Sequence, residues 1–221
     1  MKKIAFLPIA LSWLLIACTA VNAKAEAAPL AQTTIRNILE REAYPELKPH
    51  GAATIDPLLA LYQTGDVETR RRVANALYSL SIKSEQARQL LMQDIHTPHQ
   101  QLRLAVQWAV GRVSNDAEVV RTLLGNMQHD PNPLFRDKAA CALAYDQVHL
   151  TEHQRLLLFE GLVRALEDDK TDVRNIALLA LQIHTGQTKG FQPHAPLAER
   201  QLGVQQWKAW VTAYRENLTG E

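Results

Sequence analysis

Four stretches of the chain repeat the same order of apolar and polar positions. They read RRRVANAL, RLAVQWAV, RDKAACAL and RNIALLAL, and each begins with an arginine: Arg70, Arg103, Arg136 and Arg174. Apolar residues follow three, six and seven positions after each arginine, a spacing that places side chains on one face of a helix. Alanine recurs at these positions, and its small side chain lets a neighbouring helix approach closely. The pattern predicts four similar helices that pack against one another.

A second apolar segment precedes each arginine helix across a short polar break. The four segments span roughly residues 56–63, 84–95, 115–127 and 151–166. Two of them open with capping-box spacing, from Asn115 to Glu118 and from Thr151 to Gln154. The repeating unit is therefore helix, turn, helix, and it recurs about four times. Neither helix can bury its apolar face alone, so such an array is stabilised by contacts between neighbouring units.

Helical patterns also flank the repeats. Residues 31–43 carry a narrow apolar stripe, which is typical of a terminal cap. After a loop marked by two glycines, Pro196 suits the start of a last helix. Its apolar residues recur every three or four positions, and they are Val204, Trp207, Val211, Tyr214 and Leu218. We expect an all-α domain over residues 31–221, with a capping helix at each end and tryptophans in the second cap.

The arginine helices resemble those of HEAT-like repeats, an armadillo-like family in which R-x-x-A-x-x-A-L follows an Asp or a Pro. The resemblance covers about residues 56–184 and implies a right-handed α-solenoid. It also implies that each arginine pairs with an aspartate of a neighbouring turn, for which Asp66, Asp130 and Asp172 are the candidates. The chain departs from the pattern by carrying Val at the first Ala position in two repeats and by an extended connection before the fourth.

The beginning of the chain has the pattern of a bacterial export signal. Two lysines precede an apolar run over residues 4–17, which is too short to span a bilayer. The run ends in Leu-Ile-Ala-Cys, which resembles a lipobox, so we expect a lipoprotein signal peptide over residues 1–17, a lipidated Cys18 and a tether over residues 18–30. The alternative is an ordinary signal peptide over residues 1–23. We expect a protein anchored by lipid, in the outer membrane facing the periplasm, or else a soluble periplasmic one.

Net charge argues against nucleic acid as a partner. The chain has a formal charge of +1, and loss of the two lysines in the leader leaves −1. A chain this close to neutral gains little from the release of counterions, so DNA or RNA binding is not expected.

A row of large side chains marks a candidate binding face. Positions one, five and eight after each arginine point away from the predicted core. In a HEAT-like stack this side of the second helix lines the concave surface. The residues there that we expect to bind a protein partner are Tyr78, Leu104, Trp108, Cys141 and Leu179. Apolar side chains on an exposed face are typical of interaction surfaces, although tight curvature or the C-terminal segment could instead cover them.

Candidate catalytic chemistry is sparse. The pairs His96–His99 and His149–His153 have workable metal spacing, but neither has further ligands nearby to complete a shell. We expect no catalytic residues, metal or cofactor, and we interpret Cys141 as a small packing residue. The sequence favours a non-enzymatic scaffold or adaptor that binds a protein in the cell envelope. The alternatives are an enzyme similar to the HEAT-like chromophore lyases and an envelope subunit that self-associates.

Overall fold

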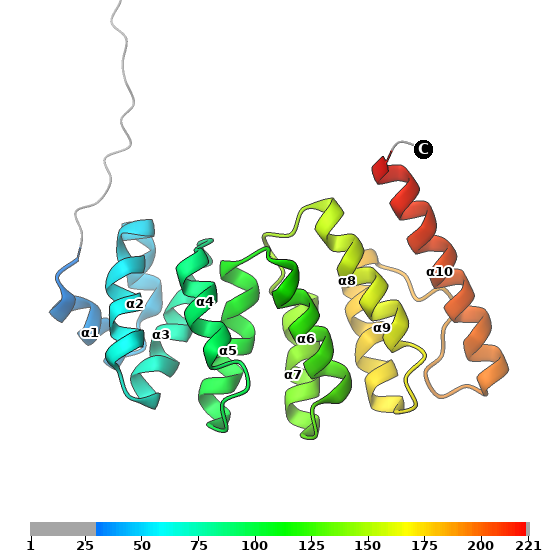
Figure 1. The fold of residues 1–221 in the computed structure, drawn as a ribbon, viewed down its shortest axis with the longest axis horizontal. Coiled ribbons are helices and arrows are strands. Elements are labelled where there is room, and N and C mark those ends of the chain that lie inside the picture. The colour runs from blue at the N-terminus through cyan, green and yellow to red at the C-terminus, as the bar shows by residue number, and fades with distance from the viewer. Residues whose placement is uncertain (1–29, 220–221) are drawn as a thin grey trace, which may run out of the picture.

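The computed structural model describes residues 30–219, and every regular element in this range is helical. Figure 1 shows the helices side by side in one row, with α1 near one end and α10 at the other. The expected signal peptide and Cys18 lie outside the described residues. Within residues 30–219, no helix combines the length and the apolar character needed to cross a membrane. The arrangement is that of an α-solenoid, as predicted.

Eight of the described helices form four pairs. The first helices of the pairs are α2 (Ile55–Thr64), α4 (Glu85–Gln93), α6 (Ala117–His129) and α8 (Glu152–Ala165). The second helices are α3 (Val67–Leu80), α5 (Gln100–Val113), α7 (Pro133–Tyr145) and α9 (Thr171–Thr185). The predicted pairs are confirmed to within a few residues at each end.

Three further elements complete the stack. They are α1 (Gln32–Glu40), the 3₁₀ segment η1 (Tyr44–Thr54) and α10 (Leu197–Thr219). The sequence pattern did not predict η1, whose backbone turns at Gly51 with φ of 52°. The flanking helices occur where they were expected, and the buried residues of α10 include Val204 and Val211.

The helix starts show which capping predictions hold. Thr151 and Gln154 form the predicted capping box at the start of α8. The predicted box from Asn115 is wrong, because Asp116 caps α6 and accepts a hydrogen bond from the Glu118 N–H at 2.7 Å. The side chain of Asn115 instead donates to Gln154 Oε1 at 3.2 Å and ties the start of α6 to that of α8.

The second helices form the more continuous layer of the stack. Each contacts the next, from α3 through α5 and α7 to α9. Among the first helices, α4 and α6 make no comparable contact, and the ion pair Arg88–Glu118 bridges them at 2.7 Å. Closer packing along one layer is expected for the inner side of a curved stack.

The arginine ladder is present with one correction. Arg103 pairs with Asp130, and Arg136 pairs with Asp172 at 2.6 Å, as the resemblance implied. Asp66 is not the partner of Arg70, because its carboxylate caps α3 by accepting from the Thr69 N–H at 2.8 Å. Arg70 pairs instead with Asp94 at 2.9 Å. Asp94 lies just beyond the end of α4.

Candidate binding surface on the second helices

Three of the predicted residues meet in one hollow. Tyr78 of α3, Trp108 of α5 and Cys141 of α7 line a space of about 310 Å³. Lys138, Tyr145 and Asp146 complete its lining. The hollow is therefore built by three successive second helices, which bring side chains more than sixty positions apart to one place.

Trp108 lies at the centre of this arrangement. Its indole is partly buried and packs against the hydrophobic core of the stack, while part of it faces the hollow. Tyr78 is partly buried in the same way, one helix earlier. Both rings are thus held in place by the core below them and still present apolar surface to a ligand.

A second and much smaller hollow, of about 20 Å³, extends the surface to α9. Cys141 and Tyr145 line both hollows, and Ile176, Leu179 and Ile183 of α9 join them in the second. Tyr145 is 59% exposed and Leu179 is 52% exposed, so both are accessible from solvent. We call the surface formed by these large side chains the second-helix strip, and its residues are Tyr78, Trp108, Cys141, Tyr145, Leu179 and Ile183.

A polar contact beneath the first hollow fixes its shape. The guanidinium of Arg112 lies 4.2 Å from the centre of the Tyr78 ring, and its Nε donates to Asp146 Oδ1 at 2.8 Å. Asp146 is buried, and burial raises the pKa of its carboxyl group, although the hydrogen bond from Arg112 opposes this. The contact links α3, α5 and the end of α7, so it positions the strip rather than offering free charge to a ligand.

Gly111 allows this close packing. A Cβ atom at this position would lie 2.4 Å from Gln147 Nε2 and 2.8 Å from the Asp146 carbonyl oxygen. Neither distance is compatible with normal contact, so only glycine lets the chain after α7 approach α5 at this point.

Leu104 does not belong to the strip. The prediction placed it on the exposed face, but it is 9% exposed and lines neither hollow. A helical wheel treats each helix alone, whereas α5 is contacted on its two sides by α3 and α7. On this closely packed layer the exposure of a side chain depends on the adjacent helices as well as on its position on the wheel.

Tyr145 is the largest exposed side chain of the strip that the sequence reasoning missed. It lies four positions after Cys141, which places both on one face of α7. It lies nine positions after Arg136, outside the positions one, five and eight that defined the predicted binding face.

The site offers little for nucleophilic or metal chemistry. Burial is the main cause that raises the pKa of the Cys141 thiol, which keeps it protonated near neutral pH. His149 Nε2 lies 2.7 Å from the Arg112 carbonyl oxygen and thus has a structural partner. Among residues 30–219, no group of three or more His, Cys, Asp or Glu side chains could hold a metal ion.

Comparison with known proteins supports the repeat interpretation. Residues 50–144 match the family model for HEAT repeats, a range that reaches from the end of η1 almost to the end of α7. The fourth pair and α10 lie outside the match, although α9 carries its arginine at the same position as the others. No curated protein matches the chain. HEAT repeats are commonly scaffolds for protein interaction, so the match agrees with a binding role without naming a partner.

Proposed function

We propose that this protein is a non-enzymatic scaffold that holds an extended segment of a partner protein along the second-helix strip. The observation that carries the proposal is the continuity of the strip. Four consecutive second helices contribute large apolar side chains to two hollows that share Cys141 and Tyr145. A soluble protein rarely leaves such side chains together at its surface without a partner to cover them.

The dimensions of the strip suit a short peptide segment. Packed helices lie roughly 8–10 Å apart, so a row of four spans about 24–30 Å. An extended chain advances about 3.3 Å per residue, so about eight residues would cross the strip. The hollow beside Trp108 is large enough for one apolar side chain, and the partly buried indole would act as its anchor.

Site-specific photo-crosslinking tests this function. A benzophenone amino acid in place of Leu179, in cells of the native host, should yield one adduct of defined mass on the strip. The matched control is Leu202 of α10, an equally large side chain that is 62% exposed and lies off the strip. Position 202 should give no such adduct.

A second variant ties the adduct to the strip. Tyr145→Ala removes an exposed side chain, so the fold should be unaffected, and the adduct at position 179 should be lost. Equal adducts at positions 179 and 202, or an adduct that survives Tyr145→Ala, would refute the proposed surface.

We further propose that the scaffold works in the bacterial cell envelope and is attached to the membrane through Cys18. Acyl chains on one cysteine contribute about 0.8 kcal/mol for each buried methylene, so two or three chains hold a protein firmly on a bilayer. Metabolic labelling with an alkyne fatty acid should mark the wild-type protein and not Cys18→Ala. Isolation of an unlabelled wild-type chain that begins at Lys24 would contradict the attachment.

A further inference from the structure

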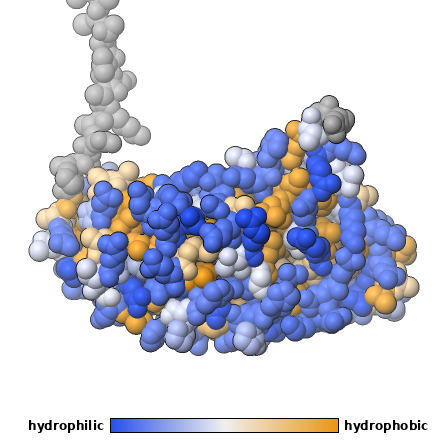
Figure 2. Space-filling model, in the orientation of Figure 1, coloured by the Kyte–Doolittle hydropathy of each residue, from blue (hydrophilic) through white to orange (hydrophobic). Residues whose placement is uncertain are grey.

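A groove between α8 and α10 differs in its chemistry from the second-helix strip. It has a volume of about 340 Å³, and Val163 and Val211 line it from opposite helices. Figure 2 shows hydrophobic surface between these two helices, with hydrophilic side chains on both sides of it. Both valines are buried, so the apolar floor is narrow and suits one aliphatic side chain.

Three cations surround this floor. Arg164 comes from α8, and Lys208 and Arg215 come from α10. Glu160 is the only carboxylate among the lining residues, and Glu167 lies beside them against Lys208, so three cations and two anions leave a local net charge of +1. A groove with this balance attracts negatively charged groups.

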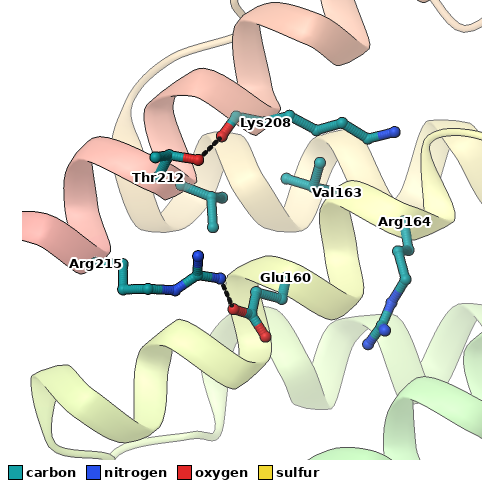
Figure 3. Close-up of a pocket in the computed structure, with 7 residues that line it drawn as sticks. Glu160, Val163, Arg164, Lys208, Thr212 and Arg215 are labelled. Carbon is teal, nitrogen blue, oxygen red and sulfur yellow. Dashed lines mark hydrogen bonds and ion pairs between the residues drawn. The ribbon is translucent and has the colours of Figure 1, made fainter.

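The existing ion pairs leave much of this charge available. Arg215 pairs with Glu160 at 2.5 Å, and Lys208 pairs with Glu167 at 2.9 Å, but both cations are about half exposed. Exposed pairs contribute only about 0–1 kcal/mol, so an incoming carboxylate can share or replace them at little cost. Arg164 makes no ion pair with any described residue, and Figure 3 shows its guanidinium apart from Glu160 and Lys208.

We infer that this groove binds an acidic segment of a protein, with carboxylates toward Arg164 and Lys208 and an aliphatic side chain on the valine floor. Charge complementarity identifies the occupant as anionic. The narrow floor favours a peptide over an anionic lipid, whose acyl chains would need a wider apolar surface beside the cations. Because α8 and α10 contact each other outside the row of second helices, the groove and the strip can be occupied at the same time.

The consequence is a protein with two docking surfaces of different chemistry. The strip is apolar, whereas the groove is basic around a small apolar centre. Two segments of one partner would bind more tightly together than either does alone, provided that the linker between them spans the distance. The inference does not rest on the function of the strip, since the groove shares no residue with it.

Fluorescence anisotropy with defined peptides tests the groove. The probe is a fluorescein-labelled peptide GELEELEG, and the comparison peptide GQLQQLQG lacks its charges. The acidic peptide should bind the purified protein, and binding should weaken as salt is added. The double variant Arg164→Glu with Lys208→Glu should weaken binding about ten-fold or more, because two attractions become repulsions.

Two further variants make the result specific. Lys48→Glu with Lys83→Glu changes the net charge equally at two exposed lysines outside the groove and should leave affinity within about two-fold. Thr212→Trp fills the groove at an exposed position without changing charge and should also weaken binding.

Four outcomes would overturn the inference. They are absence of binding, equal binding of both peptides, equal loss in both charge variants, and binding that ignores Thr212→Trp. The last measurement is the binding of the protein and its charge variants to vesicles of phosphatidylcholine with phosphatidylglycerol. If they bind in a way that depends on Arg164 and Lys208 while the acidic peptide does not, the groove is a lipid site and the peptide assignment is wrong.

Discussion

The middle repeats and the C-terminal cap use the same residue types for opposite purposes. Trp108 of α5 is partly buried and faces a hollow, whereas Trp207 of α10 is 0% exposed. The Trp207 indole N–H donates to the Thr188 carbonyl oxygen at 3.1 Å, so its one polar atom is satisfied inside the cap. One tryptophan closes the end of the core, and the other lines a hollow at the surface.

The arginines show the same contrast. In the middle of the stack, Arg136 reaches the carboxylate of Asp172 in the next repeat. Arg174 has no following repeat, and it is buried. Its guanidinium donates to the carbonyl oxygens of Asp168, Asp169 and Pro193 at 2.7–2.9 Å. Arg136 also donates to the Asp130 carbonyl oxygen at 2.9 Å, so bonds to the preceding turn are common to both arginines. What differs in the last repeat is that the Pro193 carbonyl oxygen replaces the acidic side chain that a next repeat would have supplied.

The largest effect is expected from Trp207→Ala. Truncation of a fully buried tryptophan costs about 3–5 kcal/mol, since it leaves a cavity among residues that cannot all collapse into it. Urea unfolding should show this loss, whereas Trp108→Ala should cost about half as much because part of that indole is already solvated. Equal losses in the two variants would remove the distinction between cap and strip.

A smaller loss is expected from Arg174→Ala. The change leaves the partly buried carbonyl oxygens of Asp168, Asp169 and Pro193 without this donor, and hydrogen bonds to a charged group contribute about 1.5–3 kcal/mol. The free energy of unfolding should fall by about 2–3 kcal/mol. Arg174→Lys should recover part of this loss, because an ammonium group cannot satisfy all of the carbonyls in the way that a planar guanidinium does.

Arg136→Ala is the matched variant in the middle of the stack. Its partner Asp172 is largely solvated, so the ion pair contributes little, but Arg136 also donates to the Asp130 carbonyl oxygen at 2.9 Å. The loss should therefore be about 1–2 kcal/mol, smaller than that of Arg174→Ala. The same urea titrations measure it. If Arg136→Ala destabilised the protein as much as Arg174→Ala, the two arginines would be equivalent and the closing role of Arg174 would be wrong.

The weakest effect is a pH dependence from His184, which lies where α9 meets the cap. Burial lowers the pKa of this imidazole below its ordinary value of 6.5, and Nε2 lies 2.9 Å from the Leu143 carbonyl oxygen. The unfolded chain therefore takes up a proton at a higher pH than the folded one. Stability should be constant near neutral pH and should fall as pH drops from 6.5 toward the lowered value.

Urea midpoints at pH 7.5 and pH 5.5 measure this dependence. His184→Gln cannot titrate, so its midpoint should change less between the two pH values than that of the wild type. Identical changes in the two proteins would show that His184 does not contribute.

Most of the architecture could be predicted because the sequence carries two kinds of repetition: the helical spacing of apolar residues, and the recurrence of the arginine segments. The spacing of apolar residues after each arginine gave the helices, and the recurrence of the arginines gave the stack. Prediction failed where a side chain's hydrogen-bond partner or its burial depends on groups that the repeat pattern does not take into account. Asp66 was a candidate partner for an arginine of the ladder, but its carboxylate accepts from a free N–H group at the start of α3 instead. Leu104 was placed at the surface, but it is buried on a helix that contacts a neighbour on each side.

The candidate sites were predicted to a smaller extent. Tyr78, Trp108, Cys141 and Leu179 could be found because each lies five or eight positions after a repeat arginine, on the helix face opposite the predicted core. The groove could not be found in this way, because Arg164 and Lys208 belong to helices that a whole arginine helix and a loop separate. Their proximity is a consequence of how α10 folds back onto α8, which no local pattern records.

Hydroxyl-radical footprinting of the free protein, read residue by residue by mass spectrometry, tests the contrast between strip and cap most directly. The account predicts fast oxidation of Tyr145, measurable oxidation of Trp108 and strong protection of Trp207. Protection of Trp108 and Tyr145 equal to that of Trp207 would mean that other parts of the chain cover the strip, and the proposed recognition surface would then be wrong.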